Sequence, residues 1–278
     1  MRVLLLTLLS MLAFAANSLL CRLALATGSI DAASFSAIRL ASGAAMLVLV
    51  MRLRGSSPVA SGSWAQAFWL FAYAAAFSFA YVRLPTGVGA LLLFGAVQAT
   101  MIGAGLWRGE RLAGRQWAGL VLAMGGLVAL LLPGLSAPPP GSAALMLAAG
   151  VGGGAYSLHG RQARDAGAAT AGNFVRSVPF AALLVALSLP QLAVTGPGLA
   201  YALCSGAITS GLGYIVWYAV LPRLRASVAA TVQLSVPLLA ALGGTLLLGE
   251  TWTQRLAWTG LAILGGIALV VAPRRAAA

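Results

Sequence analysis

The sequence predicts an all-α integral membrane protein, with ten transmembrane helices arranged as two inverted five-helix repeats. Three observations lead to this fold class: an apolar composition, an internal duplication and an uneven distribution of arginine. Of the 278 residues, 61% are hydrophobic and 8% are charged, and the mean hydropathy is +0.97. A soluble domain has about 25% charged residues. A chain with so few charges cannot cover a water-exposed surface, so the composition indicates an integral membrane protein and not a soluble domain.

The C-terminal half of the chain repeats the N-terminal half. The segment Arg83–Pro133 recurs 140 residues later as Arg223–Pro273. Within it, the pair Gly109-Glu110 recurs as Gly249-Glu250. A duplicated and very apolar chain is typical of secondary transporters built from two repeats.

Each membrane span needs about 20 mostly apolar residues, within a range of about 17–25. Arginines, prolines and small polar clusters divide the chain into ten such stretches with short connections. Three consecutive prolines mark the junction of the repeats, because proline ends helices and stiffens linkers. We therefore place the first repeat at residues 1–137 and the second at residues 138–278. The expected spans are residues 3–26, 32–51, 65–82, 86–106, 116–132, 142–160, 168–189, 199–221, 226–248 and 256–272.

The first span resembles a signal peptide, because Arg2 precedes an apolar stretch that ends in Ala13-Phe14-Ala15-Ala16. We expect a retained helix instead. Residues 3–26 correspond to residues 142–161 of the second half, and a segment in the middle of a chain cannot be a signal.

All 17 basic residues are arginines. If the N-terminus is cytoplasmic, twelve of them lie in inner segments and only Arg83 and Arg255 lie in outer loops. Since cytoplasmic loops are enriched in basic residues, we expect both termini in the cytoplasm. Five spans per half is an odd number, so the second half enters the membrane upside down. The net charge of +13 is carried in short loops, and no nucleic-acid partner is expected.

Two series of residues, one in each half, form a recognisable pattern. They are Tyr214–Leu221, Arg223, Ala226-Ser227, Pro237, Gly249-Glu250, Gly260 and Gly265-Gly266 in the second half, and Asn17-Ser18, Arg39, Gly109-Glu110, Gly119 and Gly125-Gly126 in the first half. Through these residues both halves resemble the EamA-type domain of the drug/metabolite transporter superfamily. The first half differs at Val97, where the second half has Pro237. The resemblance implies a multi-pass transporter of the bacterial inner (cytoplasmic) membrane, most similar to exporters of aromatic and other amino acids.

Polar side chains within spans are costly and therefore indicate function. Arg39 and Arg176 lie at equivalent positions in the second and seventh spans, where they would either pair with a substrate carboxylate or clamp neighbouring helices. Neutral hydrogen-bonding candidates are Asn17, Gln98 and Gln233, with interhelical bonding as the alternative. His159 would either couple transport to protons or lie at the interface.

Aromatic residues lie deep in several spans and predict a cavity that suits apolar or aromatic groups. Phe77 and Trp217 are 140 residues apart, so the repeat would place them on opposite sides of one cavity. Ordinary helix packing is the alternative. The aromatic site candidates are Phe77, Tyr81, Phe94, Tyr214 and Trp217.

The four acidic residues, Asp31, Glu110, Asp165 and Glu250, all lie at span ends or in loops. Proton-driven export of cationic drugs needs a carboxylate buried in the membrane. We therefore expect facilitated transport. The two glutamates are expected to bond helix ends or nearby arginines, such as Arg255.

No nucleophile–base pair, metal-ligand spacing or phosphate loop occurs in the spans, so neither an enzyme nor a cofactor or metal is expected. The expected function is export of neutral and aromatic amino acids or related small metabolites by alternating access. The partners would be this substrate and membrane lipid, and the protein would be a monomer or a weak homodimer. Two alternatives stay open: a drug or nucleotide-sugar carrier of the same fold, and a membrane scaffold that transports nothing.

Overall fold

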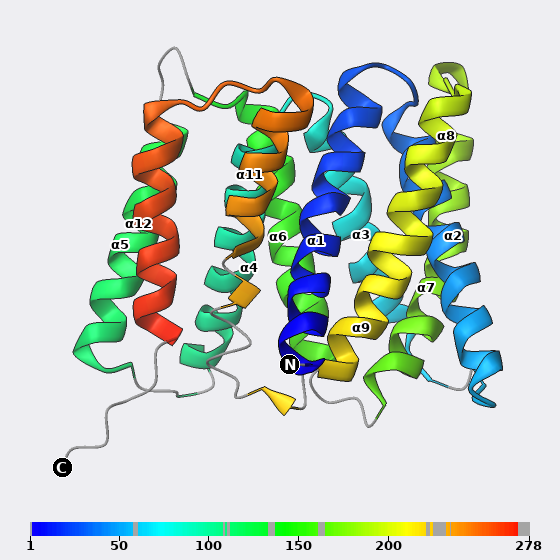
Figure 1. Cartoon of the computed structure of the whole chain (residues 1–278), viewed down its shortest axis with the longest axis horizontal. Helices are drawn as coiled ribbons and strands as arrows, with labels where there is room; N and C mark the ends of the chain where they lie inside the picture. The colour runs from blue at the N-terminus through cyan, green and yellow to red at the C-terminus, as the bar shows by residue number, and fades with distance from the viewer. Residues whose placement is uncertain are drawn as a thin grey trace.

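The fold is a bundle of long helices that stand side by side (Figure 1). The computed structural model describes residues 2–57, 61–107, 109, 112–132, 137–160, 165–220, 223–224, 232–233 and 235–271. Glu110 and the start of the expected ninth span lie outside these residues. The helices are α1 (Arg2–Ala26), α2 (Ala32–Leu53), α3 (Trp64–Tyr81), α4 (Thr86–Trp107), α5 (Gly114–Leu131), α6 (Pro140–Gly160), α7 (Ala166–Leu187), η1 (Leu189–Gln191), α8 (Gly196–Leu203), η2 (Cys204–Leu212), α9 (Gly213–Val220), α11 (Ser235–Leu248) and α12 (Gln254–Val271).

The helices agree with an all-α integral membrane protein. Within the described residues, seven are long and apolar enough to cross a membrane: α1, α2, α4, α5, α6, α7 and the continuous rod of α8, η2 and α9. α11 and α12 are also apolar, but their apolar stretches are shorter than those of the seven candidate spans. The count of ten spans and the inversion of the halves stay predictions. The helix α1 begins, and α12 ends, at the same face of the bundle (Figure 1).

Local sequence signals set the helix boundaries. Asp31 accepts a hydrogen bond from the Ser34 amide at 2.9 Å and so caps α2, and Asp165 caps α7 through the Ala168 amide at 3.0 Å. After α4 and α11 the chain turns with positive φ at Gly109 (88°) and Gly249 (64°). The repeat pairs these two positions, and both carry glycine because glycine adopts the left-handed conformation without steric cost.

Small residues allow helices from the two halves to pack closely. Gly119 and Gly126 of α5 face α12, and a Cβ atom at either position would collide with α12 atoms. Gly266 of α12 faces Ala123 and Gly119 in the same way. Helix association in membranes depends on such close packing, because lipid tails are as apolar as the helices themselves. The α5–α12 pair forms one end of the bundle (Figure 1).

Candidate substrate cavity

A cavity of about 140 Å³ lies in the bundle, between helices from both halves. Its walls come from α1, α2, α3, α4, α6, η2 and α9, together with Gln233. The volume is similar to that of an engineered cavity of about 150 Å³ that admits benzene. The cavity is therefore large enough for about one aromatic ring.

Arg39 of α2 is the charged residue of the lining and is 3% exposed. Its Nε donates to the Ser210 hydroxyl at 3.2 Å, and its Nη1 has no hydrogen-bond partner among the described residues. The guanidinium carbon lies 4.9 Å from the ring centroid of Phe77 and 5.6 Å from that of Tyr73. These ring faces attract the cation and fix its position.

The helix η2 presents Ser210 to this arginine. Residues Cys204–Leu212 form a π-helix, a rare conformation that is frequent at functional sites. Gly206 lets η2 approach α2, because a Cβ atom there would collide with the Arg39 carbonyl oxygen and the Ser42 hydroxyl. The wide turn and the close approach together place Ser210 against the guanidinium of Arg39.

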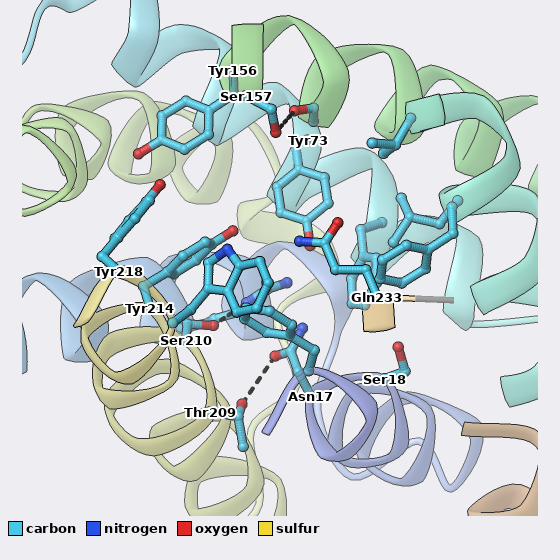
Figure 2. Close-up of a pocket in the computed structure, with 18 residues that line it drawn as sticks. Asn17, Ser18, Tyr73, Tyr156, Ser157, Thr209, Ser210, Tyr214, Tyr218 and Gln233 are labelled. Atoms are coloured by element: carbon cyan, nitrogen blue, oxygen red, sulfur yellow. Dashed lines mark hydrogen bonds between the residues drawn. The ribbon is translucent and has the colours of Figure 1, made fainter. Parts of the chain in front are cut away.

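Asn17 joins α1 to η2 beside the cavity. Its Oδ1 accepts hydrogen bonds from Ser205 Oγ at 2.7 Å and from Thr209 Oγ1 at 3.2 Å, the second of which is visible in Figure 2. Because these donors occupy the carbonyl oxygen, the free groups of Asn17 are the two N–H donors of its amide. Asn17 therefore adds donors, rather than acceptors, to the polar side of the cavity.

Aromatic rings form the apolar walls. Phe77, Phe94, Tyr214 and Trp217 line the cavity, as the sequence predicts, and Phe77 and Trp217 come from different halves. Phe14 packs against both Tyr214 and Trp217, with centroid distances of 5.7 and 6.1 Å. The ring of Tyr214 stacks on that of Tyr218 at 6.0 Å (Figure 2).

The structure places two of the expected neutral site residues outside this cavity. Tyr81 is fully buried, its hydroxyl donates to the Thr86 carbonyl oxygen at 3.2 Å, and its ring packs edge-on against Phe77 at 4.7 Å. Gln98 is buried in a separate small hollow between α4, α5 and α12, among residues such as Leu127 and Ile263. Tyr81 therefore supports the cavity wall from behind, and Gln98 lies where the two repeats pack.

The two remaining candidates also lie elsewhere. His159 is exposed near the end of α6, where its Nδ1 lies 2.8 Å from the Ala155 carbonyl oxygen. Arg176 Nη1 donates to the carbonyl oxygens of Ser61 at 2.8 Å and Gly172 at 3.1 Å. Arg176 thus holds the segment before α3 against α7, which corresponds to the clamp among its two predicted roles. Asn17, Arg39 and Gln233 are the polar candidates that do line the cavity.

An ion pair closes the bundle near the end of α1. Arg22 Nε lies 3.2 Å from Glu250 Oε1, and Arg22 Nη1 donates to the carbonyl oxygens of Tyr81 and Val82. Glu250 Oε2 accepts from the Thr86 amide at 2.7 Å and thereby caps α4. Arg255, one of the arginines expected near Glu250, donates to the Leu132 carbonyl oxygen. The expected bond to a helix end is confirmed, although that end is distant in sequence.

Several lining residues were not predicted from the sequence. Tyr73 contacts Arg39, and Ser210 and Thr209 belong to η2. A signal for η2 exists in hindsight, because Ser205, Thr209 and Ser210 place three hydroxyl groups within one apolar span. Hydroxyl groups are also common as interhelical bonds in membranes, so the signal does not by itself indicate a cavity.

Comparisons with known proteins identify the family. The sequence profile of the EamA-like transporter family matches residues 141–272. The chain carries an EamA-like transporter domain. It is 60% identical over 274 residues to the uncharacterized protein PA1977 of Pseudomonas aeruginosa, covering 98% of this chain and 96% of the relative. The EamA-like family consists of membrane transporters of small molecules, which supports a multi-pass membrane transporter of small substrates.

A solved structure shares the fold of this chain. This crystal structure, described only as that of a protein, superimposes with a TM-score of 0.66 at 20% identity, and covers 94% of this chain and 96% of its own. At that identity the likeness concerns the fold alone. Neither comparison specifies a substrate.

Proposed function

We propose that this protein exports neutral and aromatic amino acids or related small metabolites across a bacterial inner membrane by alternating access. The observation that carries the proposal is the cavity of about 140 Å³, which is lined by aromatic rings and a few polar groups from both halves. Aromatic walls with a few placed polar groups are typical of sites for small amphipathic ligands.

The helix packing supports an inverted repeat with ten spans. The third helix of the first half, α3, packs on α6, the first helix of the second half; reciprocally, α1 packs on α9 and η2. Equivalent helices also pair with one another, as in α2 with α7, α4 with α11, and α5 with α12. A twofold axis between the halves produces this reciprocity, and such an axis passes through the binding sites of inverted-repeat transporters.

The closed end of the bundle supports a direction of access. Arg22, Glu250 and the carbonyl oxygens of Tyr81 and Val82 join three segments at the face where α1 ends. The cavity extends the other way, to Ser157 near the end of α6 and Tyr218 near the end of α9. With both termini in the cytoplasm, as the arginine distribution predicts, this is an inward-facing state.

Facilitated transport agrees best with the lining. None of the described residues that line the cavity is an Asp or Glu, so no carboxylate there can exchange a proton for a substrate. A nucleotide sugar would need several cationic groups around its phosphates, whereas Arg39 is the one arginine of the described lining. These observations favour a small amphipathic cargo over the carrier alternative, and a lined cavity disfavours the scaffold.

Flux into liposomes tests the proposal. The purified full-length protein is expected to give saturable uptake of phenylalanine, and of methionine or threonine at lower affinity. Trp217→Ala removes a cavity wall and should lower phenylalanine flux at least tenfold, since a buried ring contributes about 1.5–3 kcal/mol. The control is Trp107→Ala, because Trp107 is 94% exposed.

Two outcomes would contradict the proposal. The absence of saturable flux for all three amino acids would reject the substrate class. Competition by nucleotide sugars, without competition by amino acids, would favour the alternative carrier.

A further inference from the structure

Arg39 has no acidic partner among the described residues. Asp31 and Asp165 cap α2 and α7, and Glu250 pairs with Arg22. Arg39 is nevertheless 97% buried, as its 3% exposure shows, inside an apolar bundle. A buried cation without a counter-charge is costly, which makes it a marker of a ligand site in membrane proteins.

The guanidinium of Arg39 is held in place with donor capacity left over. A guanidinium has five N–H donors, and the bond from Nε to Ser210 uses one of them. Nη1 has no acceptor among the described residues. The rings of Phe77 and Tyr73 lie against the cation, so ligand binding would not need to order a long flexible side chain.

The remainder of the lining determines what kind of anion fits. Asn17 offers amide donors next to Ser205 and Thr209, because those hydroxyl groups occupy its carbonyl oxygen. The apolar walls are aromatic, and the volume of about 140 Å³ admits one ring. A second anionic group would find no second cation in the described lining, and an ammonium group would find no carboxylate.

We propose that Arg39, with Ser210 and Asn17 beside it, is a carboxylate subsite, and that the carboxylate rather than the amino group is the feature by which the cargo is recognised. This deepens the proposed function and rests on it. The cargo class is the compact monocarboxylates that carry one aromatic or apolar group, of which the neutral amino acids are a subset. An Arg–carboxylate pair can form two parallel N–H···O bonds, which gives this recognition its specificity.

Ligand titration of the wild-type protein in detergent is the first test. Four phenyl compounds of similar size separate the charges: 3-phenylpropionate, phenylalanine, phenethylamine and 3-phenylpropanol. We expect both carboxylates to bind, and the amine and the alcohol to bind at least tenfold more weakly. Equal binding of phenethylamine or 3-phenylpropanol would overturn the subsite, as would absence of binding by both carboxylates.

Variants test which residue is responsible. Arg39→Gln is expected to weaken 3-phenylpropionate binding roughly 10- to 100-fold, the range for a charge-assisted hydrogen bond, and to leave the weak binding of 3-phenylpropanol unchanged. Arg255→Gln is the control, because Arg255 bonds the Leu132 carbonyl oxygen away from the cavity. Unchanged affinity in Arg39→Gln would reject the assignment.

A second variant keeps the arginine in place. Ser210→Ala removes the bond to Nε and should weaken carboxylate binding about threefold to tenfold. It decides the question if Arg39→Gln does not fold. Carboxylate-dependent binding without amino acid flux would reject the proposed function and support the subsite. Amino acid flux with equal binding of the amine and the carboxylate would support the proposed function and reject the subsite.

Discussion

Arg39 and Arg176 occupy equivalent positions in the two halves and have different surroundings. Each contacts the third-helix region of the opposite half: Arg39 bonds Ser210 in η2, and Arg176 bonds the Ser61 carbonyl oxygen just before α3. Arg39 meets two aromatic rings and a cavity, whereas Arg176 meets main-chain acceptors. The same residue type thus recognises a ligand in one half, by our proposal, and holds the backbone in the other.

The third helices of the two halves explain this difference. α3 is a regular α-helix over Trp64–Tyr81, whereas its counterpart contains the π-helix Cys204–Leu212. The wider helix brings a hydroxyl group to Arg39 at the depth of the cavity. Before the regular helix α3, the Ser61 carbonyl oxygen of the preceding loop accepts a hydrogen bond from Arg176. Four predictions test this asymmetry between the halves.

The largest effect is expected at the contact between η2 and α2. Gly206→Ala would drive a Cβ atom into the Arg39 carbonyl oxygen and the Ser42 hydroxyl, so η2 must move away. Overpacking of this kind costs about 1–3 kcal/mol or more, and we expect a clear drop in the thermal unfolding midpoint in detergent. Gly103→Ala is the control, because a Cβ atom there meets open space and alanine favours helix. Equal midpoints in the two variants would show that the close approach is unimportant.

A smaller effect is expected at the closed end. Removal of one charge by Glu250→Gln or Arg22→Gln breaks an ion pair whose side chains are 15% and 19% exposed. In a double-mutant cycle we expect a coupling free energy of about 1–2 kcal/mol, because the two residues share one network with the Thr86 amide. Additive losses of unfolding free energy would show that Arg22 and Glu250 act independently and do not form a closure.

The comparison of the arginines is tested directly by Arg176→Gln. The variant removes the donor to the Ser61 carbonyl oxygen and should cost about 1 kcal/mol of unfolding free energy. The affinity for 3-phenylpropionate should stay unchanged, which is the opposite of the result expected for Arg39→Gln. A loss of affinity similar to that of Arg39→Gln would mean that the two arginines share one role.

The smallest effect concerns the cap of α2. Burial raises the pKa of Asp31, but hydrogen bonds from Ser34, Ala193 and Ala33 lower it more, so the net pKa lies below the usual 3.8. The carboxylate therefore stabilises the fold at pH values above about 3.8, and this contribution is lost as the pH falls through the lower folded-state pKa.

Asp31→Asn should remove this contribution to the acid dependence. The unfolding midpoint of the variant should fall less than that of the wild type as the pH decreases toward 3. At neutral pH the variant should be less stable by about 0.5–1 kcal/mol, because asparagine can still cap the Ser34 amide but has no second oxygen to accept from the Ala193 amide. Parallel acid profiles of the two proteins would contradict the assignment of the pKa shift to Asp31.

Much of the fold could be predicted from the sequence because the signals are local. The apolar runs predicted helices such as α1 and α2 close to their observed bounds. The glycines Gly109 and Gly249, which the repeat pairs, both lie in turns with a positive φ. Phe77 and Trp217, paired by the 140-residue offset, both reach the cavity. Composition, spacing and duplication are properties of the chain itself and can be read without any contact.

Only the tertiary structure decided which side of each helix faces the cavity. Gln98 and Gln233 are the same residue type in apolar helices, yet Gln233 lines the cavity and Gln98 lies between α4, α5 and α12. In a soluble helix the polar face identifies the outer side, whereas a helix that is apolar all round gives no such indication. The π-helix of η2, the pairing of Arg22 with Glu250 and the separate environments of Arg39 and Arg176 all follow from rotations and contacts between helices, which a one-dimensional pattern does not contain.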